Sequence, residues 1–428
     1  MAIKTKRFIN LRKSYSCSMP GVWRAVAYCR GTVVIFHSPR ACAHVARTMD
    51  INSHYRSMAE ERNELMPSVP LLSSQLEEKH SIFGGVERLS QCVDFAMKQY
   101  KPQCLVIANS CVAGVIGDDV DAVARSAEEQ YGIPVLTVDC CGFLDGEYYQ
   151  GYFEITEQLV ERFLQPCETL PGTVLLLGDN GGPWGHYAVE VTRLLSLMGV
   201  KVIGQFPSYM AFEDLPKAAS AEAVIILGGR GQTHIGLSKI AAQLQSRLGV
   251  PYLDVYPVGW QQTRRWISAA GKLLGREREA AAVLAAEERR MAEGIRRFTV
   301  VTRDKKAVLC IGRLLMYYDP VATLSTIKML EMELTGIVLL DAYRDKEREE
   351  MLRTIRSYTN IPVYSPAEGE AALAAADIVL TTHELQDKKL KQLFLPMLPK
   401  VGSSGELDFM EAVYRALCSR LKGGMIYV

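Results

Sequence analysis

Three cysteines occupy positions from which thiolates could hold iron. Cys17, Cys42 and Cys111 each lie where an N-terminal segment or a predicted strand gives way to a turn or a helix. Their settings are Cys-Ser-Met-Pro-Gly, Ser-Pro-Arg-Ala-Cys-Ala-His and Asn-Ser-Cys-Val-Ala-Gly. Thiolates at such positions are favoured by the positive ends of helix dipoles, and thiolates are the ligands of iron–sulfur clusters. The pattern therefore predicts an iron–sulfur protein.

The number and spacing of the cysteines indicate the redox compartment. The 428 residues include 11 cysteines, an odd number, and no two of them form a Cys-x-x-Cys pair. This argues against a disulfide framework, a zinc ribbon and a thioredoxin-like motif, and it favours a reducing cytoplasm. The ligands of a cluster would have to converge from distant parts of the chain, so a preformed scaffold must position them.

Most of the other cysteines are expected to pack in the core. Cys104 and Cys310 fall inside predicted strands, whereas Cys140 and Cys141 end a strand near the suspected site and keep a cluster-related role as an alternative. Cys17, Cys42 and Cys111 could also be unrelated buried thiols, because cysteine is often a small buried hydrophobe.

Apolar runs alternate with helical stretches along the chain, as in repeated βαβ units. The strands are expected at residues 32–37, 104–109, 134–139, 173–177, 200–206, 223–227, 252–256, 307–311, 336–341, 362–364 and 377–381. We predict an α/β fold of three Rossmann-like domains, each with a mainly parallel sheet, over residues 1–170, 171–295 and 296–428. A proline-rich stretch at residues 166–172 and a charged, alanine-rich helix at 276–297, expected to be an exposed connector, mark the boundaries.

Charge and hydropathy exclude some classes of partner. The formal net charge is +1, which gives no electrostatic case for nucleic acid or anionic lipid. No apolar run reaches the roughly 20 residues that a membrane-spanning helix needs. We therefore expect no nucleic-acid partner and no membrane span.

The ordered motifs of the first third resemble the nitrogenase component 1 family. They are Cys17 with Gly21, Pro39-Arg-Ala-Cys42, Ser81-Ile-Phe-Gly-Gly85, Ser110-Cys111 with Ile116-Gly-Asp-Asp119, and Cys141-Gly-Phe143 with Gly151. The family includes both subunits of the nitrogenase molybdenum-iron protein, its cofactor-assembly scaffold, and nitrogenase-like tetrapyrrole reductases. The resemblance covers essentially the whole chain, weakens toward the C-terminus, and implies the same three-domain fold.

The resemblance implies a cofactor and partners. In relatives, the cysteines that match Cys17, Cys42 and Cys111 hold an iron–sulfur cluster at a subunit interface, either 4Fe-4S or a P-cluster-like 8Fe-7S. It thus implies a homologous or identical subunit that shares the cluster, and an ATP-dependent iron protein as electron donor. The activity implied is that of a two-component reductase acting on a substrate in the interdomain cavity. A scaffold that builds a metallocluster without turnover is the alternative, and a structural homologue without metal is a third.

The sequence also departs from nitrogenase itself. Nitrogenase α-subunits hold the iron-molybdenum cofactor by a cysteine in the second domain and a histidine in the third. Here residues 227–234 contain no thiol, and His383 stands outside the family's ligand motif. Dinitrogen is therefore not the expected substrate, and a tetrapyrrole or another small unsaturated or sulfur-containing molecule fits better. A second metallocofactor stays open.

Glycine-rich loops follow two predicted strands of the middle domain. Neither loop contains a Gly-x-x-x-x-Gly-Lys-[Ser/Thr] motif, so this chain is not expected to be the ATPase. Arg230, His234 and Trp184 are candidates to line the interdomain cavity. Of these, His234 and Arg230 are the candidate catalytic residues, and the remaining histidines are expected to be packed or surface residues.

Asp118 and Asp119 follow the third cysteine on a turn that begins with a glycine. Carboxylates at a helix start stabilise the helix dipole, so a structural role is expected. A role beside the cluster or in partner docking is the alternative.

Overall fold

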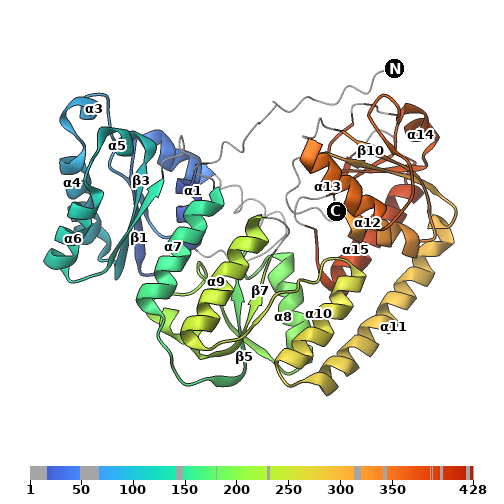
Figure 1. Ribbon diagram of the computed structural model, residues 1–428, viewed down its shortest axis with the longest axis horizontal. Coiled ribbons are helices and arrows are strands. Elements are labelled where there is room, and N and C mark those ends of the chain that lie inside the picture. Colours follow the sequence, from blue (N-terminus) through green and yellow to red (C-terminus); the bar gives the residue numbers. More distant parts are fainter. Residues whose placement is uncertain are drawn as a thin grey trace.

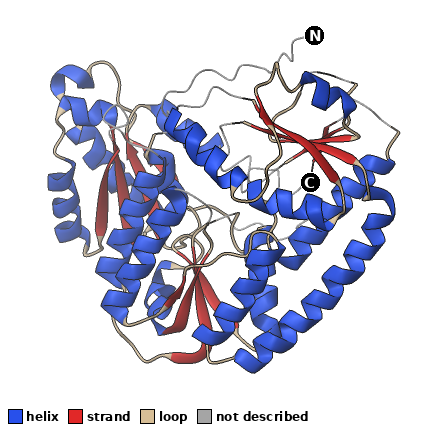
Figure 2. Cartoon of the chain, turned by 45° about the vertical axis from the view of Figure 1, so that its right-hand side comes forward, coloured by secondary structure: helices blue, strands red, loops and turns tan. Residues whose placement is uncertain are grey.

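The chain folds into three parallel sheets that follow one another along the sequence (Figure 1). The computed structural model describes residues 17–48, 67–140, 148–179, 181–228, 232–312, 320–340, 345–385, 387, 389–395, 399–420 and 425–427. Helices cover both faces of each sheet, as Figure 2 shows. The prediction of an α/β fold with three mainly parallel sheets is confirmed. We call each sheet with its helices the first, second or third lobe.

The first lobe carries Cys17, Cys42 and Cys111 and has the strand order β2-β1-β3-β4. Its strands are β1 (Thr32–His37), β2 (Leu71–Ser73), β3 (Cys104–Ser110) and β4 (Val135–Cys140). Its helices are α1 (Met19–Val26), residues 40–48, α3 (His80–Phe83), α4 (Val86–Tyr100), α5 (Cys111–Ile116), α6 (Val120–Tyr131) and α7 (Tyr148–Phe163). α4 and α6 pack on one face of the sheet, and α1 and α7 pack on the other.

The second lobe has the strand order β6-β5-β7-β8. Its strands are β5 (Leu170–Leu177), β6 (Lys201–Phe206), β7 (Ala221–Ile226) and β8 (Tyr252–Leu253). Its helices are α8 (His186–Leu197), η2 (Phe212–Ser220, a 3-10 helix), α9 (Gln232–Leu248) and α10 (Trp260–Leu273). α9 packs on α7, so Leu175 and Leu177 of β5 belong to the same apolar core as Val34 and Phe36 of β1. The first two lobes therefore share a core.

A buried ion pair also joins these two lobes. Arg24 of α1 contacts Asp179, which follows β5, and it donates a hydrogen bond of 2.7 Å to the Tyr209 hydroxyl. Tyr209 stacks on Tyr28, with 5.1 Å between the ring centroids. Asp179 belongs to one of the glycine-rich loops, so this part of the loop is fastened to the first lobe.

The third lobe has the strand order β11-β10-β9-β12-β13-β14. Its strands are β9 (Lys306–Ile311), β10 (Glu333–Leu339), β11 (Val363–Tyr364), β12 (Ile378–Thr381), β13 (Gln392–Phe394) and β14 (Met425–Tyr427). Its helices are α12 (Pro320–Met329), α13 (Asp345–Arg356), α14 (Glu370–Ala375) and α15 (Gly402–Cys418).

The long helix α11 (Glu277–Thr302) leads from the second lobe to the third (Figure 1). The sequence predicted an exposed connector over residues 276–297, and the helix differs from that in one respect. It packs on α10 and α15, and Ala280, Val283, Met291 and Phe298 on one face are buried. α11 is thus a structural bridge between two lobes.

Candidate functional site

The parallel order of the first sheet brings its strand ends to one edge. His37 at the end of β1 is in register with Asn109, and Ser110 at the end of β3 is in register with Cys140. The helix of residues 40–48 follows β1 and carries Cys42, while Cys111 begins α5 directly after β3. Residues distant in sequence thereby meet where ligands commonly bind in α/β sheets.

Cys42 and Cys111 lie close enough to influence each other. Both side chains are half-buried. The pKa of the Cys42 thiol is raised, mainly by burial, and the charge of a Cys111 thiolate raises it further, while a hydrogen bond with Ser38 works in the opposite direction. Two neighbouring thiolates repel each other, so a cation between them would stabilise both charges.

Cys17 lies at the same edge, beside the end of β4. Its sulfur accepts a hydrogen bond of 3.5 Å from the backbone N–H of Met19, at the start of α1. Burial raises the pKa of Cys140 far above its usual value, and the charge of Cys17 adds to that shift. Cys140 is in register with Ser110, the residue before Cys111, so Cys17 lies on the β4 side of this edge.

Cys17, Cys42 and Cys111 do not form a ready-made site for a single metal ion. Among the described residues, no three His, Cys, Asp or Glu side chains are grouped tightly enough to hold one metal ion. A tetrahedral single-ion site with metal–sulfur bonds of about 2.3 Å needs sulfurs about 4 Å apart, and an iron–sulfur cluster spans a wider set of thiolates. Cys17, Cys42 and Cys111 are half-buried, whereas Cys140 is fully buried and remains a protonated thiol. These half-buried thiols are the candidate ligands of an iron–sulfur cluster at this edge.

The other cysteines are placed mostly as expected. Cys29, Cys104 and Cys310 are buried, and burial raises the pKa of each. Cys141 lies outside the described residues.

A buried polar network lies behind the turns that bear Cys42 and Cys111. The Nε2 atom of His37 lies 2.9 Å from Oδ2 of Asp118, and its Nδ1 atom lies 2.9 Å from the Ser74 hydroxyl. Asp118 also accepts a hydrogen bond of 2.8 Å from the backbone N–H of Gly85. Burial lowers the pKa of His37 and Asp118 opposes that shift, so the ring is neutral near pH 7. Because a carboxylate only accepts, Nε2 carries the ring proton.

The glycines of the Phe-Gly-Gly motif make room for this network. A β-carbon on Gly85 would lie 2.4 Å from Cδ2 of Leu76 and 2.7 Å from Oδ2 of Asp118. Gly117 has a φ of +84°, a left-handed conformation that ends α5 and returns the chain so that Asp118 can turn inward. The small residues of the motif therefore allow Asp118 and its neighbours to pack closely.

The two aspartates of the Gly-Asp-Asp turn have different roles. Asp119 accepts a hydrogen bond of 2.9 Å from the backbone N–H of Ala122 and caps α6, as expected. Asp118 faces His37 and the start of α4. The sequence predicted a packed or surface role for His37 and did not predict its pairing with Asp118. The position of the histidine at the end of a buried strand was the one signal that could have indicated a polar partner.

Two of the three candidate residues of the second lobe, His234 and Trp184, lie within the described residues. Nε2 of His234, at the start of α9, lies 3.2 Å from Oδ1 of Asp254, and the ring rests against Tyr256. Its Nδ1 atom faces Gly228 and has no hydrogen-bond partner among the described residues. Trp184 is half-buried, and Arg230 lies outside the described residues. His383 packs against Gly312 in the third lobe, with its Nδ1 atom 2.8 Å from the Thr382 hydroxyl.

Comparison with known proteins identifies the family. The family model for nitrogenase component 1 type oxidoreductases matches residues 17–417. The chain belongs to this family. Nitrogenase Cp1 has a similar structure, with a TM-score of 0.65 and 15% identity over 98% of this chain and 92% of that one. At that identity, the nitrogenase match shows the fold alone.

Two curated proteins that are similar to this chain have names that state different roles. The iron-molybdenum cofactor biosynthesis protein NifE of Clostridium pasteurianum is 28% identical over 68% of this chain and 63% of its own length. The nitrogenase molybdenum-iron protein alpha chain of Methanosarcina barkeri is 23% identical over 65% of this chain and 52% of its own length. The aligned part thus spans less than two thirds of either relative.

No helix among the described residues combines the length and the apolar character that a membrane-spanning helix needs.

Proposed function

We propose that this chain is a cluster-bearing subunit of a nitrogenase-like reductase that takes electrons from an ATP-dependent iron protein. The half-buried thiols of Cys17, Cys42 and Cys111 would hold an iron–sulfur cluster at the edge of the first sheet. Such a cluster supplies one-electron transfer. The observation that carries the proposal is the position of these half-buried cysteines at one sheet edge, where Cys42 and Cys111 interact.

Two protein partners follow from this site. A homologous or identical subunit would supply the remaining ligands. The electron donor would dock over α3 and α5, where Ile82, Phe83 and Val115 have exposed fractions of 77%, 84% and 84%. These helices pack on each other and α5 begins at Cys111, so the exposed apolar surface adjoins the proposed ligand.

The substrate would occupy the interdomain cavity. The family's iron-molybdenum ligands are missing from the expected places, which favours a tetrapyrrole or another small unsaturated molecule over dinitrogen. His234 is held by Asp254 with 27% of its side chain exposed, so it can present or receive a proton there. Arg230 and Trp184 are the further candidates to line this cavity.

Iron content tests the ligand assignment. We expect Cys17→Ala, Cys42→Ala and Cys111→Ala, each purified without oxygen, to lower the bound iron and the charge-transfer absorbance together. Cys92→Ala is the matched control, because Cys92 is also half-buried in the first lobe but lies on α4. Unchanged iron in the three variants would remove them from the ligand set.

A metallocluster-assembly scaffold is the second candidate function. It is favoured by the similarity to NifE proteins, whose name states a role in cofactor biosynthesis. Both functions use the same cysteines, so the site geometry does not separate them.

Turnover separates the two candidates. A reductase subunit, given reduced iron protein and MgATP, should oxidise many equivalents of the donor in the presence of its substrate. A scaffold should stop after a stoichiometric amount and should release a metallocluster to an acceptor protein. The Cys111→Ala variant is the control in both assays.

A further inference from the structure

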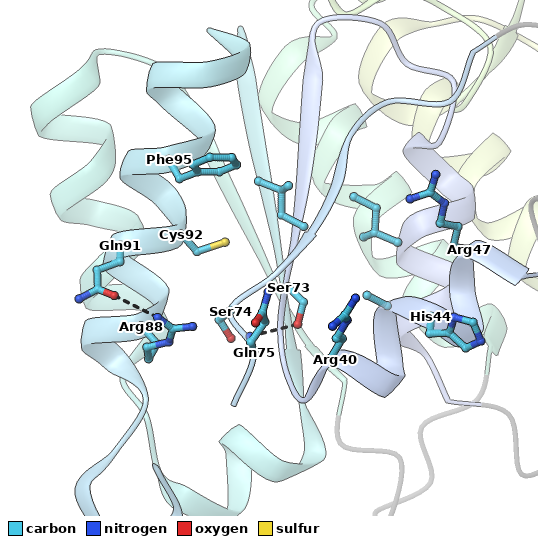
Figure 3. Close-up of a pocket in the computed structure, with 13 residues that line it drawn as sticks. Arg40, His44, Arg47, Ser73, Ser74, Gln75, Arg88, Gln91, Cys92 and Phe95 are labelled. Carbon is cyan, nitrogen blue, oxygen red and sulfur yellow. Dashed lines mark hydrogen bonds between the residues drawn. The ribbon is translucent and has the colours of Figure 1, made fainter. Parts of the chain in front are cut away.

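A basic pocket lies on the first lobe, on the side of the 40–48 helix that faces β2 and α4. It has a volume of about 530 Å³. Figure 3 shows Arg88 of α4 and Arg40 of the 40–48 helix on opposite walls, with Ser73, Ser74 and Gln75 between them. Pockets of this size accommodate drug-sized molecules.

The charge of the pocket has one sign. Arg40, Arg47 and Arg88 line it together with His44, and none of the 13 lining residues is acidic. The described residues contain no ion pair to any of the three arginines. Of the two nearby glutamates, Glu77 pairs with Lys79 at 3.1 Å and is influenced more weakly by the charge of Arg88, and Glu87 accepts a hydrogen bond from Gln91. Three guanidinium groups around one cavity that has no acidic residue in its lining attract anions.

The guanidinium group of Arg88 makes few hydrogen bonds within the protein. Its Nε atom is buried and has no partner among the described residues, and its Nη1 atom makes a long contact of 3.3 Å with Gln91. The Ser73 hydroxyl and the amide of Gln75 add polar groups to the floor.

We propose that this pocket binds a small molecule that carries at least two phosphate or carboxylate groups. Planar guanidinium groups bind both kinds of oxyanion in a bidentate manner, and arginines on opposite walls require a ligand with two separated charges. The site is distinct from the cluster site, although the 40–48 helix contributes to both. Arg40, His44 and Arg47 face the pocket, while Cys42 packs toward the core shared with α1.

Binding of defined probes to the full chain tests the proposal. Isothermal calorimetry would measure pyrophosphate and citrate, with inorganic phosphate and acetate as the single-group probes, at 50 and 200 mM salt. We expect pyrophosphate or citrate to bind at least tenfold more tightly than the single-group probes, and the better of the two identifies the head group.

Arginine variants locate the binding. Arg88→Gln and Arg40→Gln should each weaken the better probe by about tenfold, because each removes a charge-assisted contact. Arg125→Gln, an equal charge change at an exposed position of α6 outside the pocket, should leave the affinity unchanged. An equal loss in all three variants would mean diffuse attraction and overturn the proposal, as would unchanged binding in Arg88→Gln and Arg40→Gln. Iron content, measured on the same samples, should stay constant, so the result is independent of the proposed function.

Discussion

At the residue scale, the network around His37 shows what spacing alone does not reveal. The three cysteines stand out because their motifs are local. The contact between His37 and Asp118 joins residues 81 positions apart, and of the two only Asp118 lies in a motif that the sequence singles out. The arginines of the basic pocket come from two helices and were equally invisible. Sequence reasoning therefore found the proposed ligands but not the shell that supports them.

The two neighbouring aspartates give a matched test of that shell. Asp118→Ala leaves the N–H of Gly85 and the ring of His37 without their partner in a buried setting, so we expect a loss of about 2–4 kcal/mol in the free energy of unfolding. Asp119→Ala removes an exposed helix cap, which costs about 1 kcal/mol. Chemical denaturation of both variants measures the difference. Equal losses would show that the network adds nothing beyond a helix cap.

At the element scale, most strands were predictable, and three short strands were not. β1 matches its predicted range, and β3, β4 and β9 differ from theirs by one or two residues. β2, β13 and β14, with three residues each, were missed. The equally short β8 and β11 lie within the predicted ranges 252–256 and 362–364. The burial of α11 was also missed, because its charged residues hide a narrow apolar stripe.

The apolar surface of α3 and α5 leads to a prediction about the electron donor. Phe83→Ser combined with Val115→Ser should slow oxidation of the iron protein by roughly tenfold or more, because apolar anchors dominate protein interfaces. Bound iron should not change. Val300→Ser is the control, since Val300 is 83% exposed on α11. A donor rate equal to that of the control would place the docking surface elsewhere.

At the scale of the whole molecule, the second and third lobes are joined by buried charges. Arg193 of α8 lies 2.8 Å from Glu190 and 2.7 Å from Glu287 of α11, and it donates to the Ser403 hydroxyl of α15. The side chains of Glu190 and Glu287 are only 7% and 5% exposed. Arg193 and Ser403 lower the pKa of Glu287 despite its burial. This cluster holds three helices together.

Removal of the arginine should therefore destabilise the interface between these lobes. Arg193→Met leaves the buried Glu190 without this counter-charge and leaves Glu287 with only Arg290, 3.5 Å away. We expect a loss of about 2–4 kcal/mol, reduced from the fully buried case because Arg193 is a third exposed. Arg264→Met breaks an exposed pair with Glu288 and should cost less than about 1 kcal/mol. Thermal unfolding compares them, and similar melting temperatures would contradict the role of the cluster.

A buried glutamate at the same interface predicts a pH dependence. Burial raises the pKa of Glu406 to about 7, while a hydrogen bond with Thr326 opposes the shift. The folded state thus binds this proton more tightly than the unfolded state. Its contribution to stability is complete below about pH 4.5 and is lost as the pH rises through about 7.

Glu406→Gln should remove this dependence. The variant should gain about 1–3 kcal/mol over the parent protein between pH 5 and pH 8. Melting curves at both values check this, with Glu333→Gln on β10 as the exposed control. A parent protein whose stability relative to Glu406→Gln is the same at both pH values would contradict the prediction.

The apolar core common to β1 and β5 bears on how the chain can be divided. A fragment that ends near residue 170, at the boundary the prolines mark, would leave α7 and the sheet side chains beneath it facing water where α9 and β5 now cover them. We expect such a fragment to aggregate on expression. Limited proteolysis of the intact chain should yield a stable piece only when both lobes are retained together.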